Sequence, residues 1–340
     1  MAAVFQPKRL LAATDLSESN IAALRYARIL ADRFQTKLTV MYSDPIAYPV
    51  EVFGDVPTLV YASTPEHQAR LQSEVETYVD PILQGVPYDV LVTFGAPAAA
   101  VARAAEDKKA DLLVIGTHGH HGWRRALLGS VAEGVLHDAK CPVLTVSRHT
   151  PAHVPPAITR IVCPTNFSDV ARESLHAAGA LASAFQAQLV IVHVIEEHAA
   201  PADERRIRKE IGPELERFCT FREIVLRGGA AERILDCVED LAADFLVIGA
   251  QRKRFRSETV IGTTTERLVR FATCPVLTVP RPVAHAAIGL DSEVNAATVS
   301  DASAPLLHHL VGGSSAVADA GGGAAVSDQL HREPARRGLF

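Results

Sequence analysis

The sequence predicts an α/β protein built from two repeated, doubly wound, open parallel-sheet sandwiches of the Rossmann-like kind. Two observations predict this fold: the chain repeats itself, and short apolar runs alternate with amphipathic segments. ADLLVIG at 110–116 matches ADFLVIG at 243–249, and CPVLTV at 141–146 recurs letter for letter at 274–279. Alternating strands and helices with short connections are typical of a parallel sheet covered by helices on both faces.

The first copy supplies five strands and four helices. Runs of β-branched residues and leucine predict its strands at 9–14, 37–43, 88–94, 111–116 and 142–147. These runs lack polar–apolar alternation, as expected of strands buried on both faces. Amphipathic segments predict its helices at 17–34, 66–84, 97–109 and 129–139. The first helix has Ser17 as its expected N-cap, and its apolar face comprises Leu24, Ala27, Leu30, Ala31 and Phe34.

The second copy is shorter than the first. Equivalent residues lie 151 positions apart at the start (Asp15 and Asn166) and 133 apart at the end (Cys141 and Cys274), so the second copy lacks 18 residues between them. Its strands are predicted at 159–164, 188–195, 221–226, 244–249 and 275–280. We therefore expect one domain at 1–148 and a second at 155–281. Residues 282–340 are rich in alanine and glycine, and we expect a disordered tail there.

The composition excludes several classes of partner. The net charge of −5, the pI of about 6.3 and the 6 % aromatic content argue against a nucleic-acid partner. No apolar stretch reaches the length of about 18 residues that a membrane span needs. The first residues, MAAVFQPKRLLAATD, lack the apolar core and cleavage site of a signal peptide. We therefore expect a cytoplasmic protein with no membrane partner.

Cysteine and histidine predict neither a metal site nor a nucleophile. The five cysteines form no CxxC pair, so no zinc site or disulfide framework is indicated. Cys141 and Cys274 each precede a proline at equivalent places, and we interpret them as buried turn residues. No Asp, Glu or Cys between 116 and 130 accompanies the three loop histidines, so we expect no metal there. Those histidines are His118, His120 and His121.

A glycine pattern follows the fourth strand of the first copy. Gly116, Gly119 and Gly129 are spaced G-x2-G-x9-G, and Ser130 follows the last glycine. Gly116 is expected to ease the turn out of the strand, and Gly119 allows the main chain to approach a ligand closely. The next helix begins near Ser130, so its free N–H groups and its dipole favour an anion. The pattern predicts a phosphate site.

This spacing, between a strand ending in LLVIG and the segment CPVLTV, resembles the universal stress protein family. The resemblance covers both copies and implies a tandem protein with the adenine nucleotide alpha hydrolase-like fold. It implies a nucleotide-dependent stress-response regulator or sensor without efficient catalysis, whose first copy holds ATP, with or without Mg²⁺. The contacts that it implies are Ala13, Thr14, Asp15, Tyr42, Gly116, Thr117, Gly119, Gly129, Ser130 and Val131.

The resemblance also assigns roles within this set. Asp15 would accept hydrogen bonds from ribose or adenine, and Tyr42 stands where the family has a valine whose backbone meets adenine. The glycines, Ser130 and Val131 would hold ribose and phosphates. The topology agrees, because ligands of open α/β sheets bind beyond the carboxyl ends of the strands, where the strand order reverses.

The second copy departs from the pattern. Its loop, GAQRKRFRSETVIGTT, keeps Gly249 and Gly262 but has Arg252 at the second glycine, and Asn166 replaces Asp15. A long side chain stands where backbone would approach phosphate, so we do not expect ATP in this copy. Two interpretations stay open: a domain kept for packing, or a side-chain anion site. That anion site would comprise Arg252, Lys253, Arg254 and Arg256.

Three functions are compatible with the first-copy loop. The loop has no lysine and no carboxylate, and the chain contains neither GxxxxGK[ST] nor GxSxG, so we expect binding without efficient turnover and no catalytic residue. The alternatives are an enzyme, through slow ATP hydrolysis or autophosphorylation at Ser130, and a nucleotide-independent interaction scaffold.

Two further expectations concern assembly and a long connection. The CPVLTV strands end both copies, and pairing of these apolar edges predicts an intramolecular pseudo-dimer, with a homodimer as a further assembly. Residues 44–65 contain four prolines and no helical period. They are either an exposed linker or a lid over adenine. The apolar residues of such a lid are Ile46, Tyr48, Val50, Phe53 and Leu59.

Overall fold

The computed structural model describes most of both repeats. The described residues are 5–45, 48–51, 57–60, 64–117, 128–151, 155, 157–196, 207, 219–250, 252–255 and 258–280. The predicted disordered tail, 282–340, lies outside them, and so do Gly119 and the three loop histidines. No helix within the described ranges is long and apolar enough to cross a membrane.

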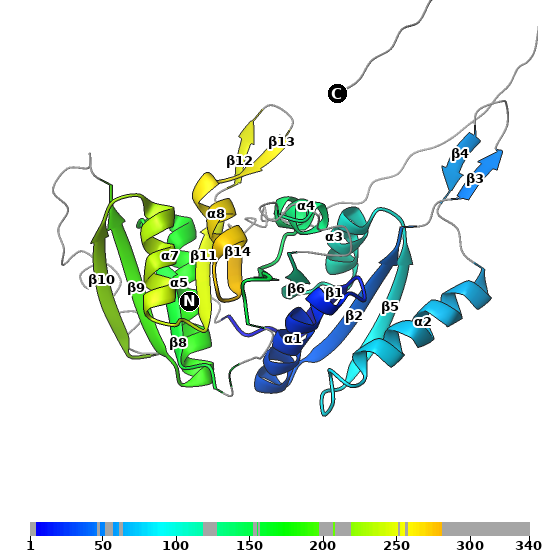
Figure 1. Cartoon of the computed structure of the whole chain (residues 1–340), viewed down its shortest axis with the longest axis horizontal. Coiled ribbons are helices and arrows are strands. Elements are labelled where there is room, and N and C mark those ends of the chain that lie inside the picture. Colours follow the sequence, from blue (N-terminus) through cyan, green and yellow to red (C-terminus); the bar gives the residue numbers. More distant parts are fainter. Residues whose placement is uncertain are drawn as a thin grey trace, which may run out of the picture. The chain divides into compact units, whose positions relative to one another are not determined.

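A single ten-stranded sheet runs through both repeats, in the order β10-β9-β8-β11-β14-β7-β6-β1-β2-β5 (Figure 1). The first repeat contributes β1 (Arg9–Thr14), β2 (Lys37–Asp44), β5 (Tyr88–Phe94), β6 (Leu112–Gly116) and β7 (Val143–Val146). The second contributes β8 (Arg160–Pro164), β9 (Gln188–Ile195), β10 (Phe221–Arg227), β11 (Phe245–Ala250) and β14 (Val276–Pro280). All ten predicted strands are confirmed, because their apolar runs fill a sheet that is buried on both faces.

Helices cover both faces of this sheet, as a doubly wound fold requires. The first repeat contains η1 (Glu18–Asn20), α1 (Ile21–Phe34), α2 (Pro65–Val79), α3 (Pro97–Asp107) and α4 (Ser130–Asp138). The second contains α5 (Asp169–Phe185), α7 (Ala230–Asp240) and α8 (Thr263–Phe271). One core joins α1, α2 and α5 to the sheet, and the other joins α3, α4, α7 and α8 to its opposite face.

The predicted apolar face of the first helix is confirmed, and one cysteine prediction needs correction. Leu24, Ala27, Leu30 and Ala31 are buried in α1, and the half-buried Phe34 packs against the same core. Cys274 is buried as expected, whereas Cys141 is half-buried.

Two short hairpins were not predicted from the sequence. In the connection 44–65, β3 (Tyr48–Glu51) pairs antiparallel with β4 (Pro57–Val60). In the second repeat, β12 (Arg252–Phe255) pairs antiparallel with β13 (Glu258–Ile261). Each strand is four residues long, too short for a periodicity to reveal it. The connection is therefore not structureless.

The terminal strands of the repeats pair with each other, as predicted. β7 and β14 are antiparallel, with Leu144 opposite Leu277. The Thr145 hydroxyl donates to the Val276 carbonyl at 3.1 Å, and the Ser147 hydroxyl donates to the Ala272 carbonyl at 3.0 Å. This pairing covers two apolar strand edges within one chain.

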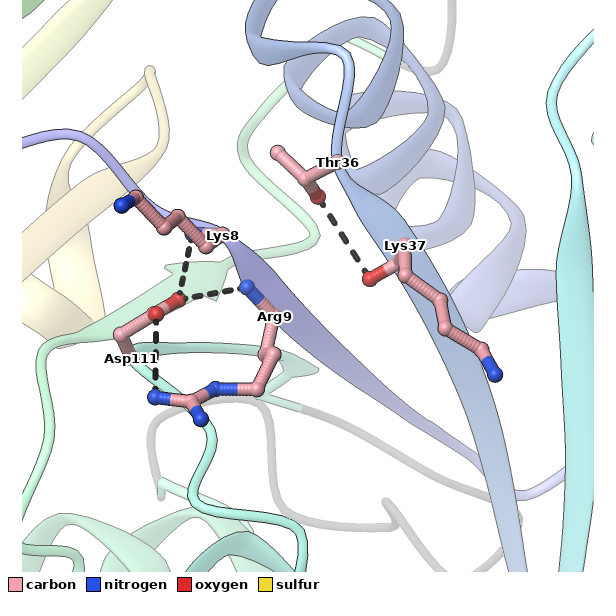
Figure 2. Close-up of polar contacts among 5 residues, drawn as sticks. All are labelled: Lys8, Arg9, Thr36, Lys37 and Asp111. Carbon is pink, nitrogen blue, oxygen red and sulfur yellow. Dashed lines mark hydrogen bonds and ion pairs between the residues drawn. The ribbon is translucent and has the colours of Figure 1, made fainter.

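The aspartate of the repeated Ala-Asp sequence has a structural role at the amino ends of the strands. Asp111 accepts hydrogen bonds from the backbone N–H groups of Lys8 (2.9 Å) and Arg9 (2.8 Å), as Figure 2 shows. In the second repeat, Asp244 accepts from the N–H groups of Thr159 (2.7 Å) and Arg160 (2.9 Å). Each carboxylate fixes the start of its repeat's first strand, at the edge opposite the predicted site.

Candidate functional site

Six of the first-repeat residues predicted from the sequence lie at the carboxyl edge of the sheet. β1 lies between β6 and β2, with Ala13 opposite Ile115 and Thr14 opposite Tyr42. The strand order reverses between β1 and β6, because the chain continues from β1 to β2 on one side and places β6 on the other. Ligands of open α/β sheets bind at such a reversal. Ala13, Thr14, Asp15, Tyr42, Gly116 and Thr117 all lie at this edge.

Asp15 organises the turn that leaves β1. Its Oδ1 accepts the Ser17 N–H at 3.1 Å and the Ser17 hydroxyl at 2.6 Å. Leu16, between them, has a φ of 62° in the left-handed region, and its N–H donates to the Thr14 hydroxyl at 3.1 Å. Asp15 itself is half-buried. The carboxylate acts as a hydrogen-bond acceptor in this turn.

Ser17 lies at the predicted N-cap position, before the 3₁₀ turn η1 that leads into α1 at Ile21, but its side chain makes no cap hydrogen bond. The Ser17 hydroxyl donates to Asp15 instead. In the second repeat, the Asn166 Oδ1 accepts the Ser168 N–H at 3.1 Å. The Ser168 hydroxyl then accepts the Ala171 N–H at 3.3 Å and caps α5 directly.

Tyrosines and carboxylates surround this turn. The Tyr78 hydroxyl, from α2, donates to the Ser17 carbonyl at 2.7 Å. Burial, followed by the negative charges of Asp15 and Glu18, raises the pKa of Tyr78 to about 12. Burial also raises the pKa of Tyr42, as do the nearby charges of Asp44, Glu74 and Asp15. The carboxyl end of β1 and β2 is therefore rich in hydrogen-bond acceptors.

Sequence reasoning missed an aspartate–histidine pair beside this cluster. The His67 Nε2 lies 2.8 Å from the Oδ2 of the buried Asp44, and the Arg70 guanidinium lies 2.7 Å from His67 Nδ1. Because arginine only donates, Nδ1 accepts, and the imidazole donates from Nε2 to Asp44. The pair ties the first turn of α2 to the end of β2. Its only sequence signal was an aspartate at the carboxyl end of a strand.

The N-terminus of α4 forms the other side of the edge. The Gly129 N–H donates to the Thr117 carbonyl at 2.9 Å, and the Thr117 N–H donates to the Val146 carbonyl at 3.0 Å. These bonds hold the start of α4 at the end of β6. Ser130 is exposed and Val131 is half-buried, so both are accessible at the first turn. The first N–H groups of a helix have no partner within it and point toward an anion.

The backbone conformation at Gly116 is an ordinary one. Among the described glycines, positive φ values occur at Gly85, Gly95 and Gly228, and Gly116 is not one of them. Its backbone therefore does not require glycine for its conformation. The equivalent Gly249 indicates another reason, because a Cβ there would lie 2.7 Å from the Val170 carbonyl oxygen of α5. Close helix approach explains glycine at that position of the second repeat.

The second repeat forms a different structure after its fourth strand. The β12–β13 hairpin follows β11 where the first repeat has its glycine-spaced loop. Arg252, Lys253 and Arg254 belong to β12, and Arg256 lies outside the described residues. Gly262 and Thr263 still begin a helix, α8, at the position equivalent to α4.

A pocket at the opposite edge of the sheet is not part of this site. Its lining includes the starts of β2 and β5, where Lys37 and Asp89 form an ion pair at 2.6 Å. Ligands of open α/β folds bind at the carboxyl ends of the strands instead.

The family model described as universal stress protein family matches residues 7–147 and 157–280. The chain belongs to the universal stress protein family. The two matched segments correspond to the two repeats, so this is a tandem universal stress protein. The family resemblance predicted from the glycine spacing is confirmed.

Individual universal stress proteins agree with this assignment. One from Methanocaldococcus jannaschii is 32 % identical over 146 residues, which cover 42 % of this chain and 82 % of the relative. A solved universal stress protein from Archaeoglobus fulgidus has a TM-score of 0.63 at 24 % identity, covering 80 % of this chain and 98 % of its own. A putative one from Pseudomonas aeruginosa has a TM-score of 0.57 at 19 % identity, covering 82 % and 95 %. These structures show the shared fold.

Proposed function

We propose that the first repeat binds ATP, with or without Mg²⁺, and that the chain is a nucleotide-dependent stress-response regulator or sensor without efficient catalysis. One observation carries the proposal. The start of α4, a set of acceptors at Asp15 and the end of β2 at Tyr42 converge on the edge where the strand order reverses.

The start of α4 offers hydrogen-bond donors for phosphates, and the ends of β1 and β2 offer acceptors for a nucleoside. The free N–H groups and the dipole at the start of α4 favour the phosphates, which Gly129, Ser130 and Val131 would hold. Asp15 and the backbone at Tyr42 offer acceptors to the hydroxyl and amine donors of a nucleoside. Gly119 remains in the proposed site and lies outside the described residues.

Binding without turnover follows from the residues available to the phosphates. The segment 116–131 contains no lysine, aspartate or glutamate. Phosphoryl transfer needs groups that neutralise the γ-phosphate, hold a metal ion and orient the nucleophile. We therefore propose a sensor whose ligand state, and not a product, carries the signal.

The second repeat is proposed to serve packing and to bind no ATP. Arg252 and a hairpin occupy the position where the first repeat has a glycine-spaced loop. The proposed domain limits remain 1–148 and 155–281, and a homodimer of the whole chain remains a proposed further assembly.

Isothermal titration calorimetry of the full chain with ATP, with and without Mg²⁺, tests the proposal. We expect one ATP per chain with low-micromolar affinity, and a loss of at least tenfold in Asp15→Ala or Gly119→Arg, which imitates the second repeat. The matched control Asn166→Ala, at the equivalent position, should bind as the unmodified chain does. No binding, or equal losses in Asp15→Ala and Asn166→Ala, would contradict the proposal.

A further inference from the structure

One side chain at the start of α1 is buried without a hydrogen-bond partner. Asn20 is 4 % exposed, and its Oδ1 has no partner in the described structure. The residue ends η1 and stands at the N-cap of α1, yet its side chain makes no cap hydrogen bond. Buried polar atoms are nearly always paired, so an orphaned acceptor beside a candidate site needs a partner, which a bound ligand can supply.

The position of Asn20 places this acceptor near the proposed nucleotide. Ala23, Leu24 and Ala27 follow it at helical spacing on the buried face of α1, so Asn20 begins the stripe that faces the sheet. η1 contacts β6, and β6 and β1 flank the reversal in strand order. Asn20 therefore lies at the start of α1, beside the β1–β6 reversal at which the nucleotide is proposed to bind.

The second repeat supplies a natural comparison. Ala171, also buried, occupies the position equivalent to Asn20, and there the first turn is capped by Ser168. The fold therefore accepts alanine at this position. The amide occurs in the repeat whose glycine spacing is intact and is absent from the repeat in which Arg252 interrupts it.

We infer that Asn20 is a further ligand-binding residue, and that its Oδ1 accepts a hydrogen bond from a ribose hydroxyl of the bound nucleotide. The inference rests on the proposed function and adds a residue to its site. Ribose is the donor-bearing part between the base at β2 and the phosphates at α4. An unfilled acceptor destabilises the ligand-free protein, and the bound sugar removes that penalty.

The test combines affinity and stability in the full chain. Calorimetry gives the dissociation constants of ATP, 2′-deoxy-ATP and 3′-deoxy-ATP for the unmodified protein and for Asn20→Ala. We expect Asn20→Ala to weaken ATP binding about five- to tenfold, the value of one hydrogen bond. The deoxy nucleotide that lacks the hydroxyl bound by Asn20 should have the same dissociation constant for the unmodified protein and for Asn20→Ala. The melting temperature of ligand-free Asn20→Ala should be at or above that of the unmodified chain.

Thr278→Val is the matched control, because Thr278 Oγ1 is another buried atom without a partner, on β14. This variant should leave every nucleotide affinity unchanged. If the unmodified chain binds ATP and Asn20→Ala binds it equally well, the inference is overturned while the proposed function stands. Equal discrimination against both deoxy nucleotides in the two proteins would also overturn it. Failure of the unmodified chain to bind ATP would overturn both.

Discussion

Substitution of Gly249 by alanine tests whether the glycine at the end of β11 is held by packing. A Cβ on Gly249 would lie 2.7 Å from the Val170 side chain, 2.7 Å from its carbonyl oxygen and 2.9 Å from its carbonyl carbon. Two of these atoms are backbone in the first turn of α5, so no rotamer change relieves the contact. The helix end must move by several tenths of an ångström to restore ordinary van der Waals distances.

The expected loss follows from that geometry. Overpacking in a well-packed core costs about 1–3 kcal/mol, and we expect Gly249→Ala near the upper value because backbone has to shift. The control is Gly262→Ala, whose nearest neighbour would be Thr265 Oγ1 at 4.0 Å and whose φ of −59° suits alanine. Its stability should change by less than about 1 kcal/mol, with a gain expected from the stiffer unfolded chain.

Urea denaturation followed by circular dichroism measures both variants against the unmodified chain. The midpoint should fall for Gly249→Ala and hold or rise for Gly262→Ala, with unchanged slopes. Equal midpoints for the two variants would refute the packing argument. In that case the glycine would need another explanation, including a ligand in the second repeat.

Three other predictions follow from side-chain contacts in the two repeats. Ser168→Ala removes the N-cap of α5 and should destabilise the chain by about 1 kcal/mol in urea denaturation; no change would show that the cap contributes nothing. His67→Ala removes a hydrogen-bond partner of the buried Asp44 and should cost about 1–3 kcal/mol, whereas His67→Gln, which can still donate, should cost less. Tyr78 gives a pH dependence: its pKa in the folded chain is about 12, and the ordinary value is 10.0. The unfolded state therefore loses this proton first, so stability is full below pH 10 and falls as the pH rises toward 12. Tyr78→Phe should make the fall in melting temperature over that range shallower, with the remaining slope due to other groups of raised pKa such as Tyr88, and an unchanged slope would contradict the assignment.

The sequence predicted the sheet well because each strand is a continuous apolar run. All ten strands fall within one residue of the predicted ends, since such runs are buried on both faces and no competing interaction shifts them. The sequence predicted the N-cap position of Ser17 correctly, but it could not show that the Ser17 side chain makes no cap hydrogen bond, because that depends on which acceptor the serine meets. Ser17 meets a carboxylate and Ser168 does not, a difference of one residue type upstream.

Some residues of the candidate site could be predicted from the strand order, and others depend on side-chain contacts that the sequence does not reveal. Residues at strand ends, such as Asp15 and Tyr42, follow from topology, since carboxyl ends of parallel strands share one edge. Asp44 and His67 do not, because their contact joins a strand to a helix across a connection without a recognisable period. Asn20 was missed for a related reason: a polar residue at a helix start reads as a surface cap until its burial is known.

The antiparallel pairing of β7 with β14 has a consequence for how this chain could diverge. Within each repeat the sheet is parallel, so the antiparallel junction makes the carboxyl edges of the two halves face in opposite directions. In a dimer of identical chains every substitution is present twice, at both edges. Covalent fusion removes that constraint. The loop of the second repeat can contain Arg252 while the loop of the first repeat keeps Gly119. The second repeat still supplies β14, which pairs with β7 of the first repeat.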